Sequence, residues 1–135
     1  MATAFDPESV TSPAARLPAV IALPGEIDIT NARDVHDALA RAVDGGATVV
    51  IANAIRTTYC DCAGVRALIG AHRRAAAAGT ALRVAAVTGH PVRRILELTG
   101  ADQILAIYPT VAAAGAGQLA RKLNASAEGD PGSAM

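Results

Sequence analysis

Two thiols and a carboxylate follow one another at Cys60, Asp61 and Cys62. An apolar run at 47–52 precedes them, and apolar residues recur at three- and four-residue spacing from Leu68 onward. These patterns predict a buried strand before the thiols and a helix after them. Asp61 is then a good N-cap, and Cys62 lies at or next to the first helical residue, where the helix dipole is positive. Such turns are common places for a site in open α/β folds.

The thiol of Cys62 has two interpretations. The helix dipole favours a reactive thiolate, whereas the carboxylate of Asp61 opposes thiolate formation. Cys62 is therefore either a redox-sensing thiol, with Cys60 as a second redox candidate, or an inert small residue. A disulfide between the two cysteines would be strained within three residues, and the thiols face apart if Cys60 points into the core.

Metal and enzyme chemistry are not expected. Structural zinc takes four nitrogen or sulfur ligands, and the three histidines, His36, His72 and His90, lie at no recognised metal spacing. The Cys-x-x-Cys spacing of redox proteins is absent, which ranks a thiol enzyme last among the hypotheses. No metal or other cofactor is predicted.

A catalytic carboxylate pair is equally hard to support. Asp28 and Asp61 could form one, but no clustered histidine, nucleophile elbow or phosphate loop accompanies them. Asp28 more simply caps or tethers the loop before the first helix. Thr57 and Thr58 are hydroxyls close to Cys62, either as alternative phosphosites or as ordinary residues at the end of a strand. We expect a protein that is not an enzyme.

Composition narrows the class of partner. The chain has 135 residues, enough for one domain, with twelve basic and twelve acidic side chains. A neutral chain with almost no aromatic residues lacks both the positive field and the stacking surfaces of a nucleic-acid-binding protein. No signal peptide opens the sequence, and no apolar run approaches the roughly 20 residues of a membrane span. We expect a cytoplasmic protein with reduced thiols.

Strands and helices are predicted to alternate, which indicates an α/β fold. The predicted strands, apolar on both faces except at Arg83, cover residues 18–23, 48–52, 82–87 and 104–108. The predicted helices cover 31–43, 62–78, 91–99 and 109–123. Thr30 is the expected N-cap of the first helix, and Ile95, Leu96 and Leu98 are expected to contact the core from the third. A further edge strand is expected near 9–12.

The stretch Asp61-Cys62-Ala63-Gly64-Val65 resembles the phosphorylation loop of the STAS domain in bacterial anti-sigma factor antagonists, Asp-Ser-(Ser/Thr/Ala)-Gly followed by Leu or Val. Three other segments follow in the family's order. Residues 25–28 resemble the Gly-Glu-Leu-Asp that ends the family's second strand. Residues 79–84 resemble the start of the family's next strand, and residues 92–100 resemble its third helix. Together the four segments cover about residues 17–122.

The resemblance implies the STAS fold, a small mixed sheet of four to five strands with an N-terminal edge hairpin, covered by about four helices. We predict an N-terminal segment at 1–16, the STAS domain at 17–123 and a disordered tail at 124–135.

The sequence departs from the family at the phosphoacceptor. The family has serine where this chain has Cys62, and a kinase cannot use a thiol as it uses a hydroxyl. Asn53 also stands where the family often has Asp. We expect the fold to survive both changes and the usual phosphorylation switch to be lost.

The function that the resemblance implies is partner switching in bacterial transcription regulation, as in stress responses. The chain would bind an anti-sigma factor, of the ATPase and kinase type, and so release a sigma factor. It would be constitutively competent, controlled by its synthesis, or controlled by oxidation of Cys60 or Cys62. The expected partner-binding residues are Asp28, Thr30, Thr58, Asp61, Cys62, Ala63, Gly64, Val65, Arg66, Leu68 and Ile69. The alternative is a STAS scaffold or subunit of a sensory or transporter complex, and a homodimer is left open.

Overall fold

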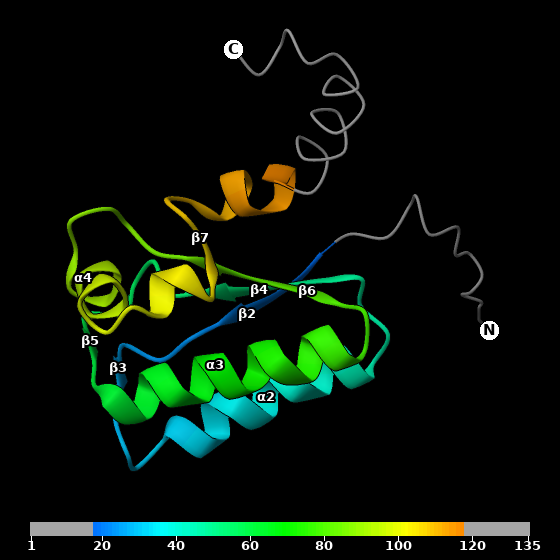
Figure 1. Cartoon of the computed structure of the whole chain (residues 1–135), viewed down its shortest axis with the longest axis horizontal. Coiled ribbons are helices and arrows are strands. Elements are labelled where there is room, and N and C mark those ends of the chain that lie inside the picture. The colour runs from blue at the N-terminus through cyan, green and yellow to red at the C-terminus, as the bar shows by residue number, and fades with distance from the viewer. Residues whose placement is uncertain (1–17, 118–135) are drawn as a thin grey trace, which may run out of the picture.

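A four-stranded sheet forms the centre of the computed structural model, which describes residues 18–117 (Figure 1). Its order is β2–β4–β6–β7 and every neighbouring pair is parallel. The strands are β2 (Ala19–Ala22), β4 (Val49–Asn53), β6 (Ala81–Ala85) and β7 (Ala106–Tyr108). The inner strands β4 and β6 are buried along most of their length, as parallel strands covered on both faces should be. The α/β prediction is confirmed.

Helices cover both faces of this sheet (Figure 1). On one face lie α2 (Ala32–Asp44) and α3 (Cys62–Ala77), which run side by side in the same direction and begin at the same end. A helical segment at 111–117 covers the other face. The short α4 (Pro91–Leu98) and the 3-10 turn η2 (Ala101–Gln103) lie between β6 and β7 in the chain.

The core is aliphatic, as the scarcity of aromatic residues predicts. Its larger part lies between the sheet and the helices α2, α3 and α4, with Leu39, Leu68 and Leu96 fully buried. A smaller part lies on the other face, where Ala114 packs near β4 and β6. Arg83 of β6 is buried there, and its Nη1 atom donates to the Ala114 carbonyl at 2.8 Å.

A second, two-stranded sheet joins the segments before the two parallel helices. It pairs β3 (Glu26–Ile27) with β5 (Tyr59–Cys60) in parallel, with Ile27 opposite Cys60. Backbone bonds continue on either side, from the Thr58 amide to the Gly25 carbonyl at 2.7 Å and from the Asp61 amide to the Ile27 carbonyl at 3.1 Å. This small sheet therefore fixes the starts of α2 and α3 relative to one another.

Two predictions about element ends and one about a core contact are wrong. Asn31, not Thr30, is the N-cap residue of α2, because the Thr30 amide and hydroxyl donate to Asp28. Leu98 is 79% exposed, since it lies two positions from the buried Leu96 and so on the far side of α4. The last strand begins at Ala106 rather than at 104, because the amides of Ile104 and Leu105 donate to the Ala101 carbonyl and close the turn after η2.

Two predicted regions fall outside the described residues. They are the edge strand near 9–12, which would form part of the expected N-terminal hairpin, and the tail at 124–135. The last predicted helix is described only up to residue 117. None of the helices within 18–117 combines the length and the apolar character that crossing a membrane requires.

Candidate functional site

The start of α3 is held by the side chain that the sequence predicts. Asp61 has extended backbone dihedrals, and its Oδ1 atom accepts from the amides of Ala63 at 2.9 Å and Gly64 at 3.1 Å. The bonds satisfy two of the free amides of the first turn. Cys62 is the first helical residue, and its side chain is exposed. Position 62 is thus presented to solvent on a fixed helix end.

Gly64 allows the first turn of α3 to lie directly against the small sheet. A Cβ atom at this position would stand 2.5 Å from Cys60 Sγ and 2.8 Å from Ile27 Cγ2. Both distances are far inside van der Waals contact, so a larger residue would push the helix away from β3 and β5. The glycine therefore sets how closely position 62 lies to the strand ends.

Cys60 and Cys62 have opposite environments. Cys60 is buried in the core, and burial together with the charge of Asp61 raises the pKa of its thiol to about 11. Its Sγ atom lies 3.6 Å from the Asp61 carbonyl oxygen. Cys60 is protonated at neutral pH and shielded from solvent, which leaves Cys62 as the accessible thiol.

The loop before α2 is built on Asp28. Its Oδ1 atom accepts from the Thr30 amide at 2.9 Å and from the Thr30 hydroxyl, and these bonds lower the pKa of the Asp28 carboxyl. The Asn31 side chain closes the other side, accepting from the Asp28 amide at 3.0 Å and donating to the Glu26 carbonyl at 2.8 Å. The predicted tethering role of Asp28 is confirmed.

The two threonines before β5 differ in access. Thr57 is 4% exposed, and its hydroxyl donates to the Pro24 carbonyl at 2.8 Å. Thr58 is exposed, and its hydroxyl lies 3.2 Å from the Gly25 carbonyl. Thr57 therefore anchors the loop, and Thr58 is the more accessible hydroxyl of the two. The Oδ1 atom of Asn53 accepts a hydrogen bond from the Ile55 amide at 3.1 Å. The carboxylate of an Asp at this position could accept the same hydrogen bond.

The expected partner-binding residues divide by burial. Thr30, Thr58, Cys62 and Arg66 are exposed, and Asp28, Asp61, Ala63 and Ile69 are half-buried. The remaining three are buried: Gly64, Val65 and Leu68. These three residues pack against the strands and the core rather than lying on the surface. They hold the start of α3 in place beneath the exposed residues.

A model of the STAS domain family matches residues 7–114, which is most of the chain. The chain belongs to the STAS domain family. No curated protein sequence matches it.

Solved structures that resemble this STAS domain come from more than one kind of protein. An anti-sigma factor antagonist from Mycobacterium paratuberculosis is 23% identical, with a TM-score of 0.64 over 72% of this chain and 81% of that chain. A sulfate transporter family protein from Wolinella succinogenes is 19% identical, with a TM-score of 0.64 over 73% of this chain and 82% of that chain. At these identities the two likenesses establish the fold alone.

The anti-sigma factor antagonist SpoIIAA is also similar. Its unphosphorylated form is 26% identical, with a TM-score of 0.56 over 78% of this chain and 88% of that chain. The phosphorylated form of SpoIIAA, from Bacillus, has also been solved. SpoIIAA is thus a phosphorylated relative, whereas the exposed residue after Asp61 in this STAS domain is a cysteine.

The surface of the STAS domain holds residues that sequence reasoning missed. Ile29, beside the Asp28 loop, is 80% exposed, and Tyr59 of β5 is 51% exposed. The sequence did hold one indication that Ile29 is exposed, because this apolar residue lies between the polar residues Asp28 and Thr30. Arg33 was also missed, and it lines a groove between α2 and α3 together with Arg66. No group of three or more metal-binding side chains occurs within residues 18–117.

Proposed function

We propose that this STAS domain is a non-enzymatic, cytoplasmic anti-sigma factor antagonist. It binds an anti-sigma factor and so releases a sigma factor for transcription. The observation that carries the proposal is the exposed position 62 on the Asp61-capped start of α3, beside the Asp28 loop. Similarity to SpoIIAA supports the class of partner.

The docking surface that we propose consists of the exposed and half-buried members of the predicted set, with two apolar additions. Ile29 and Tyr59 supply large side chains that can be buried against a partner, and such anchors dominate binding at many interfaces. The docking surface therefore comprises Asp28, Ile29, Thr30, Thr58, Tyr59, Asp61, Cys62, Ala63, Arg66 and Ile69.

Phosphorylation does not control this surface in the usual way. A phosphate after Asp61 would add bulk and about two negative charges where the partner docks, but Cys62 has no hydroxyl to accept it. The protein is then constitutively competent or controlled by its synthesis, unless oxidation of Cys62 takes the place of phosphorylation.

Oxidation by hydrogen peroxide supplies bulk at the same position. The sulfur of Cys62 attacks one peroxide oxygen, the O–O bond breaks, and sulfenic acid and water form. If this is the control, binding to the anti-sigma factor weakens in peroxide and recovers in reductant. Equal affinity in the two conditions contradicts the redox version. Cys62→Ser, which lacks the thiol, is the control that should bind equally in both.

The first experiment is affinity capture of the tagged chain from lysate of its own bacterium in reductant, with partners identified by mass. We expect an anti-sigma factor of the ATPase type. Adding that purified partner and ATP to Cys62→Ser tests whether a hydroxyl at position 62 restores phosphorylation. Capture without any anti-sigma factor would contradict the proposal.

A second candidate function is a STAS scaffold or subunit of a transporter or sensory complex. It is favoured by the likeness to the Wolinella transporter family protein, whose TM-score equals that of the mycobacterial antagonist. Recovery of transporter subunits or of a large sensory assembly in the same capture experiment would support this function and leave the fold assignment intact.

A further inference from the structure

An open groove of about 300 Å³ lies between the first turns of α2 and α3, adjoining the docking surface. Its small apolar lining consists of Ala32, Ala63 and Ala67. Its polar lining consists of Arg33 and His36 from α2 and Arg66 from α3. Two residues, Ala63 and Arg66, belong to both the groove and the docking surface.

Within residues 18–117, no acid forms a short ion pair with either arginine of the groove, although Asp37 on the same helix attracts Arg33 at longer range. The short ion pairs among residues 18–117 join His36 to Asp37, Arg74 to Asp44 and Arg93 to Glu97, and none includes Arg33 or Arg66. Both side chains are exposed. The positive ends of the two helices lie at the same end of the fold, which adds to the positive field (Figure 1).

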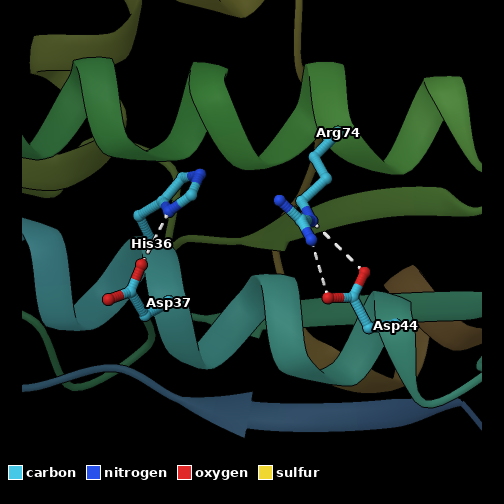
Figure 2. A network of polar contacts seen from close by, with 4 residues as sticks. All are labelled: His36, Asp37, Asp44 and Arg74. Carbon is cyan, nitrogen blue, oxygen red and sulfur yellow. Dashed lines mark hydrogen bonds and ion pairs between the residues drawn. The ribbon is translucent and has the colours of Figure 1, made fainter.

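Of the three acids nearest in sequence to the groove, two are hydrogen-bonded and the third lies on another side of α2. The Asp61 carboxylate accepts from the first-turn amides of α3. Asp37 bonds the His36 ring at 3.1 Å, and Figure 2 shows this pair between the two helices. Asp34 lines a separate pocket on the other side of α2, beside the end of β2. The groove therefore holds two exposed arginines that form no short ion pair within residues 18–117, and an anion bound between them would be attracted to both.

The lining also indicates the kind of anion. An alanine floor offers apolar contact to methylene groups, and the arginine rim offers charged donors to a carboxylate. A glutamate or aspartate side chain on a protein combines these two parts, whereas a free inorganic anion has no apolar part to place on the alanines. The His36 ring lies close to Gly70 of α3, where an added Cβ would stand 3.3 Å from its Cδ2 atom.

We infer that the groove between Arg33 and Arg66 receives an acidic side chain of the docked anti-sigma factor. This inference rests on the proposed function and names the chemistry of its partner surface. It assigns to Arg33, which lies outside the predicted docking set, a direct contact with the partner.

Charge reversal tests the contact. Arg33→Glu and Arg66→Glu should each weaken binding of the purified anti-sigma factor by about tenfold or more, because a like charge then faces the partner's acid. Arg73→Glu is the matched control: it is the same change at an exposed arginine of α3 that does not line the groove. It should change the Kd by less than about threefold. Equal melting temperatures will show that the variants are folded.

Cross-linking identifies the acid itself. Lys122 is the chain's one lysine, so Arg33→Lys or Arg66→Lys introduces an amine with little background. A carbodiimide activates a partner carboxyl, the amine attacks it, an amide forms and the urea leaves. We expect an amide link from position 33 or 66 to an Asp or Glu of the anti-sigma factor, and none from Arg73→Lys.

The outcomes separate the inference from the function on which it rests. If the wild-type chain binds the anti-sigma factor, but charge reversal leaves the Kd unchanged and no link forms at 33 or 66, the inference is wrong and the proposed function stands. If phosphate alone stabilises the wild-type chain but not the double reversal, the groove holds a small anion and the inference is overturned. If no anti-sigma factor binds the wild-type chain, both fail.

Discussion

Gly64 is the residue whose substitution should disturb the site most directly. A Cβ there meets Cys60 Sγ and Ile27 Cγ2 at less than van der Waals distance. We predict that Gly64→Ala lowers the free energy of unfolding by about 1–3 kcal/mol, measured by urea denaturation, because overpacking forces backbone or side-chain shifts. Gly25→Ala, where nothing lies within 4 Å of the added Cβ, should change it by less than about 0.5 kcal/mol. Equal losses in the two variants would contradict this packing.

The buried thiol of Cys60 should make stability depend on alkaline pH. Its pKa is raised from an ordinary value of 9.0 to about 11. The thiol of the unfolded chain therefore releases its proton first as the pH rises. The stability linked to this group is complete below pH 9.0 and is lost as the pH rises through about 11. We predict that urea denaturation at several pH values shows a shallower decline in Cys60→Ala than in the wild type.

The matched control is the accessible cysteine. Cys62→Ala should retain the wild-type decline in stability over that pH range. Iodoacetamide should alkylate Cys62 in the native protein and leave Cys60 unmodified until the chain is unfolded. Alkylation of both thiols at similar rates in the native protein would show that Cys60 is not shielded.

At the scale of elements, the start of α3 depends on one side chain. Asp61→Ala removes the acceptor of two first-turn amides and should cost about 1 kcal/mol of stability. Asp61→Asn keeps an acceptor oxygen and should cost less, since asparagine caps helices almost as well. Urea denaturation measures both. A loss in the asparagine variant as large as in the alanine variant would show that charge, rather than the capping bonds, stabilises this end.

The elements that the sequence predicted are those with long, clear patterns. The apolar run before Cys60 and the spaced apolar residues after Leu68 define β4 and α3 well. The strands β3 and β5 have two residues each, too few for any period to be visible. Their pairing depends on contacts between distant parts of the chain, so it was not predicted.

The candidate site shows the same division. The Asp61 cap and the Asp28 tether are local, within three residues of their partners, and the sequence indicates both. The groove between Arg33 and Arg66 exists because β3 and β5 align the two helices. No local pattern in the sequence indicates that alignment. The burial of Val65 and Leu68 follows from which face of α3 meets the sheet.

At the scale of the whole molecule, one end of the fold carries the proposed function. The starts of α2 and α3 and the small sheet lie together there, away from the end where Arg74 and Asp44 join the two helices (Figures 1 and 2). Arg74 Nη2 lies 2.7 Å from Asp44 Oδ2, and both side chains are about half exposed, so this ion pair contributes little to stability. The central claim concerns position 62 at the opposite end.

The most direct test of that claim is the affinity of Cys62→Glu for the captured anti-sigma factor, measured by calorimetry in reductant. Because Cys62 is exposed, the substitution should leave the fold intact while adding charge and bulk to the docking surface. We predict that Cys62→Glu weakens binding by about a hundredfold, because docking must then desolvate the added carboxylate, whereas Cys62→Ala binds within about threefold of the wild type. Unchanged affinity in Cys62→Glu would place the interface elsewhere and contradict the account.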